Sequence, residues 1–132
     1  MNNKTIKSIR VFDKKEKRYI KSIPSDCNLK IEIKYNELYL TGNEFYRFIF
    51  HTGMQDFNGN FIFPYDVLKL YKNKGSIKKN EFIIRTVKKE VYKEILIDES
   101  GIKPPVDLID VFKRFYRIEV VGNKLDESGI LK

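Results

Sequence analysis

A strictly alternating run between Leu29 and Tyr35 constrains the fold of this chain more than any other feature of its sequence. Apolar and charged residues take turns along it, in the order Leu29, Lys30, Ile31, Glu32, Ile33, Lys34 and Tyr35. Because successive side chains of a β-strand point to opposite faces, this pattern predicts a strand with one apolar and one polar face. The chain contains no alanine, the best helix former, but holds 8 Tyr and 10 Phe, which fit a pleated surface. We therefore expect a mainly β protein.

Other apolar runs predict further short strands that are separated by polar turns. The runs at 6–12 and 18–23 flank the charged segment 13–17 and predict a hairpin. The dipeptide at 58–59, Asn-Gly, is a hairpin turn signal, because glycine tolerates the left-handed backbone of a tight turn. Further strands are expected at 38–40, 45–50, 66–71, 81–87 and 117–121. Residues 90–97 fit a strand or a helix, and their Val, Ile and Tyr content favours the strand.

One short helix is predicted directly after Pro104-Pro105. Proline is favoured at a helix start, Asp107 would lie near the positive end of the helix dipole, and Lys113 and Arg114 near its negative end. The sequence shows no internal repeat and no linker long enough to divide it, and 132 residues suffice for one core. We therefore expect a single domain over residues 1–132.

Cysteine and histidine are scarce, which limits the chemistry and the location that the sequence predicts. Cys27 is the only cysteine, so an internal disulfide and a cysteine-clustered metal site are excluded, and a reducing, cytoplasmic setting is expected. The N-terminal residues lack the apolar segment of a signal peptide, and charges interrupt every stretch that approaches a membrane span. Neither a membrane partner nor a cofactor is expected.

Three segments resemble a known family. Residues 52–68 read TGMQDFNGNFIFPYDVL and are similar to the central motif of the phage and prophage YopX-like family. Residues 118–123, IEVVGN, are similar to the C-terminal signature of that family, and residues 9–17, IRVFDKKEK, to its opening strand and turn. The three segments occur in the order and at the spacing of the family, so the resemblance spans most of the chain.

The resemblance implies a small β-barrel of the Src-homology-3 type over residues 45–132, preceded by an N-terminal β extension over residues 1–44. It also implies a phage or prophage origin, and hence the cytoplasm of an infected or lysogenic bacterial host, but no particular activity. One position departs from the family, which has glycine before Asp66 where this chain has Tyr65. Since tyrosine resists the positive φ that glycine permits, the turn before Asp66 is expected to differ from the family's turn.

No catalytic constellation is recognisable, so a non-enzymatic protein is expected. His51 has no Ser, Cys or second His as a partner, and we interpret it as a strand-end histidine bonded to the backbone. The carboxylate pairs Asp98-Glu99 and Asp107-Asp110 are interpreted as solvated surface, and Cys27 as an inert thiol. A metal site is not expected, although carboxylates alone leave magnesium open. The turns of the family-like motifs are interpreted as fold-defining rather than as a ligand site.

The net charge of +8 is concentrated in two parts of the chain. Residues 1–34 carry a net charge of +6 and residues 76–95 of +3, whereas acidic and basic residues nearly balance elsewhere. If the basic turns lay at one end of a barrel, they would attract a polyanion, with Tyr19 and Tyr92 stacking on bases. The candidate cations are Lys14, Lys15, Lys17, Arg18, Lys21, Lys78, Lys79, Arg85, Lys88 and Lys89. The alternative interpretation is a solvated lysine-rich surface, since glutamates are interleaved with these lysines.

The leading functional hypothesis is an interaction module that binds a host or phage protein, or another macromolecule, without catalysis. Strand aromatics would anchor the partner, namely Tyr39, Phe45, Phe57 and Tyr71. One form of the hypothesis is an anti-defence inhibitor that covers the surface of a host protein. The alternatives are electrostatic binding of DNA or RNA, and sequestration of a small anionic ligand such as a nucleotide beside the N-terminal extension. Strand edges in so β-rich a chain also favour a homo-oligomer.

Overall fold

The computed structural model describes residues 9–20, 30–34, 37–41, 46–90 and 93–126. These residues form antiparallel sheets and two short helices, which confirms the prediction of a mainly β protein. The chain divides into two compact units. Unit 1 comprises Met1–Phe50 with Leu125–Lys132, and unit 2 comprises His51–Lys124. The resemblance begins the barrel at residue 45, whereas unit 2 begins at His51.

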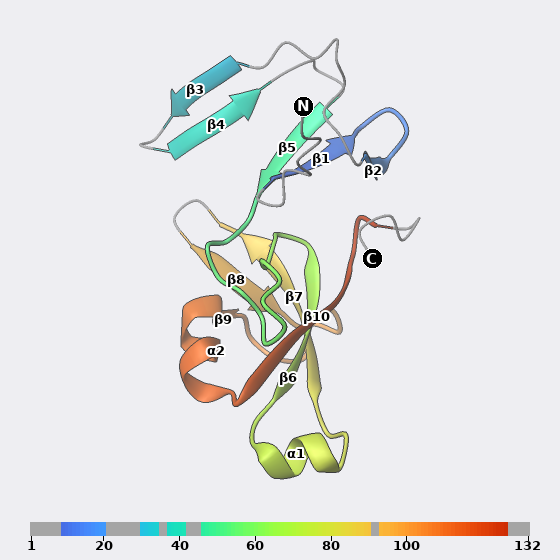
Figure 1. The fold of residues 1–132 in the computed structure, drawn as a ribbon, viewed down its shortest axis with the longest axis vertical. Coiled ribbons are helices and arrows are strands. Elements are labelled where there is room, and N and C mark those ends of the chain that lie inside the picture. The colour runs from blue at the N-terminus through green and yellow to red at the C-terminus, as the bar shows by residue number, and fades with distance from the viewer. Residues whose placement is uncertain (1–8, 21–29, 35–36, 42–45, 91–92, 127–132) are drawn as a thin grey trace. The chain divides into compact units, whose positions relative to one another are not determined.

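Unit 1 contains a three-stranded antiparallel sheet in the order β2-β1-β5 (Figure 1). Its strands are β1 (Ile9–Asp13), β2 (Arg18–Ile20) and β5 (Tyr46–Phe50). β1 and β2 form the hairpin that the polar segment between them predicts, with Asp13 opposite Arg18. The resemblance assigns β5 to the barrel, but β5 pairs with β1 over its whole length, from Ile9 opposite Phe50 to Asp13 opposite Tyr46. β5 therefore belongs to the sheet of unit 1.

A separate two-stranded sheet in unit 1 contains residues 30–34, the described part of the alternating run (Figure 1). β3 spans Lys30–Lys34 and β4 spans Glu37–Thr41, and the two strands pair antiparallel. The strand predicted from strict alternation is thereby confirmed, and so is the short strand that follows it. In a pleated strand this alternation gives the hairpin one apolar and one polar face.

Unit 2 is organised around a five-stranded antiparallel sheet in the order β10-β6-β7-β8-β9. Its strands are β6 (Asp66–Tyr71), β7 (Ile83–Lys89), β8 (Glu94–Ile97), β9 (Val106–Asp107) and β10 (Arg117–Asn123). The segment that fits a strand or a helix is a strand in its described part, since β8 pairs with β7. β10 and β9 lie at the two ends of the order and do not pair with each other, so the described residues show an open sheet and no closed barrel.

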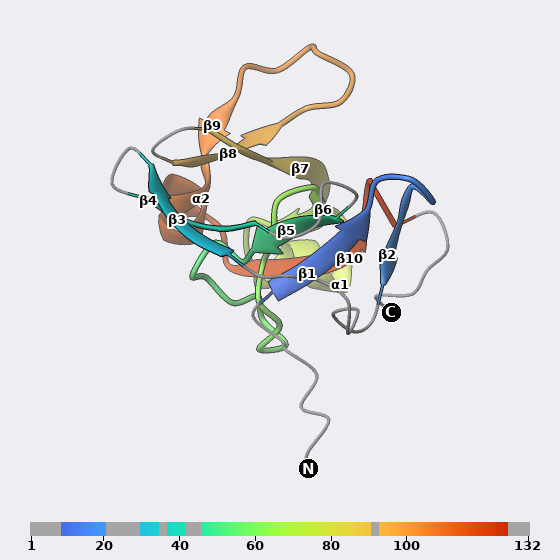
Figure 2. The same ribbon diagram turned by 90° about the horizontal axis from the view of Figure 1, so that it is seen from above.

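Two short helices complete the described part of unit 2. α2 spans Leu108–Arg114, which confirms the predicted helix, but it begins after β9 rather than directly after the prolines. α1 (Lys74–Lys78) is not predicted from the sequence, because Lys74-Gly75 is typical of a turn. Its N-cap is Asn73, whose Oδ1 accepts the Ser76 backbone N–H at 2.9 Å and so stabilises the first helical turn. The long connection between β8 and β9 has no regular structure and projects from the sheet (Figure 2).

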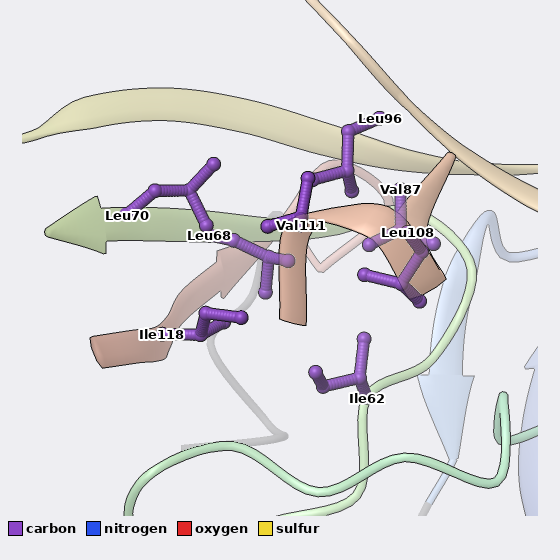
Figure 3. Packing of buried hydrophobic residues seen from close by; sticks show 8 residues of the cluster. All are labelled: Ile62, Leu68, Leu70, Val87, Leu96, Leu108, Val111 and Ile118. Carbon is purple, nitrogen blue, oxygen red and sulfur yellow. The ribbon is translucent and has the colours of Figure 1, made fainter. Parts of the chain in front are cut away.

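The core of unit 2 consists of eight buried aliphatic side chains that point toward one another (Figure 3). They are Ile62, Leu68, Leu70, Val87, Leu96, Leu108, Val111 and Ile118. Leu68 and Leu70 are two apart on β6 and so share its inner face, and Leu108 and Val111 are three apart and share one face of α2. Burial of each such side chain contributes about 1.5–3 kcal/mol. The cluster therefore fixes β6, β8, β10 and α2 against one another, and with them the loops that they connect.

Tyr65 adopts a left-handed backbone conformation with a φ of 72°, which non-glycine residues rarely take. The expectation that this turn differs from the family's turn, because tyrosine resists a positive φ, is therefore wrong. Two backbone hydrogen bonds hold the conformation. Tyr65 N–H donates to the Val87 carbonyl at 2.8 Å, and Lys124 N–H donates to the Tyr65 carbonyl at 2.9 Å. The turn is thus tied to β7 and to the residue after β10, and these bonds offset the local strain.

Tyr65→Gly is expected to be more stable than Tyr65→Ala by about 1 kcal/mol in its free energy of unfolding. Both substitutions remove the same aromatic side chain, and only glycine relieves the left-handed strain. Urea denaturation followed by circular dichroism measures the difference between the two variants. Equal stability of the pair, or an advantage for alanine, would show that the positive φ at this position carries no cost.

Candidate functional site

The carboxylate of Asp56 holds the loop of the central motif together. Its Oδ1 accepts the backbone N–H groups of Asn58 at 3.0 Å and of Asn60 at 2.9 Å. Its Oδ2 accepts the N–H of Val120 on β10 at 2.9 Å. Asp56 is only 7% exposed, so these donors replace the water that a carboxylate otherwise binds. Both oxygens are occupied by the backbone of the chain itself, which favours a structural role for this residue.

A second carboxylate joins the same motif to the end of β10. Asp66 has no exposed surface, and its Oδ2 accepts the N–H of Phe63 at 2.8 Å. Its Oδ1 accepts the side-chain amide of Asn123 at 2.8 Å, and that amide also donates to the Pro64 carbonyl at 3.3 Å. Asn123 therefore bonds to the central motif twice, in addition to the bond between Val120 and Asp56, which supports the interpretation of the turns of both segments as fold-defining.

Phe57 extends from this loop into solvent. It is 62% exposed, and its backbone N–H donates to the Ile118 carbonyl at 2.8 Å. The guanidinium of Arg117 lies over the phenyl ring at 3.9 Å from its centroid, and Nη2 of Arg117 donates to Oε1 of Glu119 at 2.7 Å. We call Phe57, Arg117 and Glu119 the Phe57 surface. It presents an aromatic ring whose position is fixed by its backbone hydrogen bond, by the neighbouring Asp56 contacts and by a guanidinium contact.

The exposure of two of the four predicted aromatic anchors is known, and it differs between them. Phe57 is exposed as expected, whereas Tyr71 is 6% exposed and is therefore not an exposed anchor. Tyr71 is the last residue of β6, and its ring packs edge-on against the ring of Phe82, with 5.8 Å between the two ring centroids. Tyr39 lies on β4, where only its backbone is described, and Phe45 lies outside the described residues.

The turn between β1 and β2 displays four of the candidate cations. We call this set the basic turn, and its exposed members are Lys14, Lys15, Lys17 and Arg18. Asp13 organises the turn, because its Oδ1 accepts the backbone N–H groups of Lys15 at 2.9 Å and of Glu16 at 3.0 Å. A local carboxylate of this kind fixes a turn against the backbone. The charges of the basic turn are therefore presented on an ordered hairpin.

Of the two tyrosines predicted to stack on bases and the cation Lys21, only Tyr19 lies among the described residues. Tyr19 is completely buried and packs edge-on against Phe12 at 5.3 Å between centroids, so it is not available to stack on a base. Tyr92 and Lys21 lie outside the described residues. The alternating pattern explains the burial of Tyr19, since it lies opposite Phe12 in the β1–β2 register.

The candidate cations of unit 2 lie at opposite ends of a strand. Lys78 and Lys79 end α1 before β7 begins, whereas Lys88 and Lys89 are the last two residues of β7. At about 3.3 Å per residue, the two ends of this strand are about 20 Å apart. Arg85 lies in the middle, and its guanidinium donates to the Ile84 carbonyl at 2.7 Å. These residues of unit 2 therefore do not form one compact cationic cluster.

His51 is bonded to the backbone, as expected for a histidine at a strand end. Its Nδ1 accepts the N–H of Gly53 at 2.9 Å, and its ring is stacked on Phe61 at 4.1 Å between centroids. The nitrogen that accepts this bond is not available to take a proton from a substrate. The predicted bond of His51 to the backbone is confirmed, and these contacts support its interpretation as a structural residue.

One member of each carboxylate pair, Asp98 in the first and Asp107 in the second, bonds to other residues of unit 2. The hydroxyl of Ser100 and the backbone N–H groups of Ser100 and Lys103 donate to Asp98, and they hold the pKa of this carboxyl below its usual value. A lowered pKa disfavours the proton donation that an acid catalyst needs. Asp107 forms an ion pair of 3.1 Å with Lys93. The first pair therefore belongs to an ordered turn, and the second lies where β9 ends and α2 begins.

Metal binding and membrane crossing find no support in the part of the chain that the structure describes. These residues contain no group of three or more His, Cys, Asp or Glu side chains that could hold a metal ion. They also contain no helix of the length and apolarity that a membrane crossing requires.

Several surface residues of unit 2 are not singled out by the sequence alone. Arg117 and Glu119 are two apart on β10 and so share one face, and this spacing of opposite charges is the signal that predicts their contact. Ile109 and Tyr116 are exposed around α2, and Ile102 is 79% exposed in the connection between β8 and β9. Ile102 has no periodic signal, because its loop has no regular structure.

Comparisons with protein-family models, with curated proteins and with solved structures found no match to this chain. Its site is therefore interpreted from its own geometry.

Proposed function

We propose that this chain is a YopX-like, phage- or prophage-encoded interaction module that binds a host or phage protein without catalysis. The observation that carries the proposal is Phe57, a largely exposed phenylalanine on a loop that Asp56 locks to β10. In one form of the proposal the partner is a host defence protein whose surface the module covers. The Phe57 surface is the contact that we assign to the partner.

The physical argument rests on the cost of ordering a binding residue. Partner binding must offset the loss of side-chain and loop freedom, so residues that are already fixed bind more tightly. Phe57 is fixed by its N–H bond to Ile118 and by the guanidinium of Arg117 on its ring. Aromatic and arginine side chains are also the residues on which interface energy concentrates. The Phe57 surface combines both types on one rigid support.

We also propose that unit 2 is a variant of the Src-homology-3-type barrel that the resemblance implies, and its strand order supports this proposal. In the order β10-β6-β7-β8-β9, the last strand returns beside the first strand of a meander, after the short helix α2. The sheet is therefore one strand pairing, β9 with β10, short of a closed barrel, and closure would require strong tilt of the strands. The positive φ of Tyr65 further supports the family assignment, because it supplies the conformation of the family's glycine.

Phe57→Ala is expected to weaken partner binding by about 30-fold or more, the effect typical of an interface hot spot. The partner is first isolated by native pull-down from a lysate of the infected or lysogenic host, with nuclease treatment to remove bridging nucleic acid. Its affinity for both forms is then measured by calorimetry. Ile102→Ala is the matched control, since Ile102 is even more exposed but lies in a different loop of unit 2. Unchanged affinity of Phe57→Ala would contradict the proposal.

A second candidate function is electrostatic binding of DNA or RNA through the basic turn. The observation that favours it is the ordered hairpin on which Lys14, Lys15, Lys17 and Arg18 are exposed. Lysines are point charges that neutralise phosphates without distinguishing bases, so such binding would be insensitive to nucleotide sequence. The burial of Tyr19 removes one stacking contact and leaves the electrostatic attraction as the main contribution.

The combined substitution Lys14→Gln, Lys15→Gln and Lys17→Gln is expected to reduce the salt dependence of nucleic-acid binding. Removing one lysine–phosphate ion pair should lower the slope of log affinity against log salt by about 0.9 for duplex DNA. Fluorescence anisotropy of a labelled duplex between about 50 and 200 mM salt measures this slope. Lys78→Gln with Lys79→Gln is the control, since it removes two lysines of unit 2 and leaves the basic turn unchanged. Absence of wild-type binding at the lowest salt would exclude this candidate.

A further inference from the structure

The hairpin of β3 and β4 is a two-stranded sheet, and its register is well defined. Lys30 lies opposite Thr41, Glu32 opposite Tyr39, and Lys34 opposite Glu37. None of the other described strands pairs with β3 or β4. An isolated two-stranded hairpin is marginally stable in water, and independent stability needs a third strand or packing of its apolar face. The hairpin therefore has a physical reason to acquire a further strand.

The register also separates the residues of the hairpin into two faces. Ile31 lies opposite Leu40 and Ile33 opposite Leu38, so these four positions share one face. The remaining positions share the other face and are Lys30, Glu32, Lys34, Glu37, Tyr39 and Thr41. A strand that joins the hairpin must keep this alternation, because a shift by one residue exchanges the two faces.

The two strands of the hairpin differ in how well their sequences protect an unpaired edge from pairing with a further strand. β3 carries three charges in five residues, Lys30, Glu32 and Lys34, and charged side chains are the usual protection of an edge that faces water. Glu37 is the only charged residue among the five residues of β4, and the strand contains neither lysine nor proline. The composition of β4 is that of a strand with a neighbour on each side.

The sequence of β4 is complementary to itself. In an antiparallel pairing centred on Tyr39, two copies place Leu38 opposite Leu40 and Glu37 opposite Thr41, with no like charges opposite each other. The same pairing of β3 centred on Glu32 places glutamate opposite glutamate and Lys30 opposite Lys34, which is repulsive. Charge therefore selects β4 over β3 for pairing with a second copy.

We propose that this protein forms a two-fold dimer in which β4 pairs antiparallel with β4 of a second copy. The product is a four-stranded sheet in the order β3-β4-β4-β3, with one continuous apolar face made of eight aliphatic positions. Two-fold pairing of this kind is the commonest symmetry of homo-oligomers. The inference concerns unit 1 and is independent of the function proposed for the Phe57 surface in unit 2.

The test introduces a positive or a negative charge at position 39, the centre of the proposed pairing, in two variants of the full-length protein. Light scattering after size exclusion should show a dimer for the wild type and monomers for Tyr39→Lys and for Tyr39→Glu, because each variant places like charges opposite each other on the two-fold axis. An equimolar mixture of the two variants should form a heterodimer, since it places lysine opposite glutamate. The mixture also controls for folding, because an unfolded variant would not form the heterodimer.

A matched control is Glu32→Lys, which changes the charge at the position directly opposite Tyr39 across the hairpin. This variant should remain dimeric, since β3 is the outer strand of the proposed sheet. A wild type that stays monomeric up to about 1 mM, the weak end of specific association, overturns the proposal. Dimers that persist in both Tyr39 variants overturn it as well, and so does a mixture that remains monomeric.

Discussion

Asp56→Ala is expected to lower the free energy of unfolding of the chain by about 3 kcal/mol. The substitution removes the acceptor of three backbone N–H groups, two in the motif loop and one on β10. Each backbone N–H that is left without an acceptor in a partly buried position lowers the free energy of unfolding by about 1–3 kcal/mol. Because domains are stable by only about 5–15 kcal/mol, this loss is a large fraction of the total. Urea denaturation followed by circular dichroism measures it.

Asp98→Ala is the matched control for this substitution. Asp98 also accepts three hydrogen bonds, from the backbone and hydroxyl of Ser100 and from the backbone of Lys103, but in an exposed loop. There water can replace the missing acceptor, so the expected loss of stability is much smaller than that of Asp56→Ala. Equal losses at both positions would show that burial of Asp56 and its bond to β10 add nothing to the stability of the chain.

Asp66→Ala is expected to destabilise the chain by about 3 kcal/mol as well, and Asn123→Ala by about half as much. Asp66 is fully buried and accepts both the N–H of Phe63 and the amide of Asn123. Asn123→Ala removes the amide that donates to Asp66 and to the Pro64 carbonyl, but it leaves the bond between Phe63 and Asp66 in place. The double variant should be less destabilised than the sum of the two single variants, because they share one bond. Thermal or urea denaturation of the four forms gives this coupling, expected at about 0.5–3 kcal/mol.

The outcome of this cycle bears directly on the segments that resemble the YopX-like family. Additive losses would mean that Asp66 and Asn123 act separately, and the view that one motif locks the other would be wrong. A coupling of the expected size would instead explain why both segments are present together in one chain. The explanation would be structural, since the bonds of both residues are made within the fold.

The sequence predicts the strands of this protein well where alternation or a turn signal is local. The hairpin of β1 and β2, the alternating strand β3 and the strand β6 all follow from patterns within ten residues or so. The pairing of β5 with β1 does not follow from a local pattern, because it joins residues more than thirty positions apart, from Ile9 opposite Phe50 to Asp13 opposite Tyr46. α1 is missed because its stability comes from the Asn73 cap rather than from helix-forming residues.

The candidate site shows the same division between local and distant information. Exposure of Phe57 agrees with its place beside a turn, and the backbone bond of His51 follows from its place at a strand end. Burial of Tyr71 and the positive φ of Tyr65 do not follow, because distant partners impose both. The contact of Arg117 with Phe57 joins residues sixty positions apart, and no local pattern predicts it.

The hydrogen bonds between the motif loop and β10 have a consequence for how unit 2 can be recognised. Many domains capture a peptide by β-augmentation, in which the peptide adds to the outermost strand of a sheet through main-chain bonds. On β10 the Val120 N–H and the Ile118 carbonyl are already bonded to Asp56 and Phe57. At the other side of the sheet β9 spans only two residues. A peptide that adds to β10 must first displace the Asp56 loop, so the sheet favours partners that recognise side chains over partners that extend its ladder.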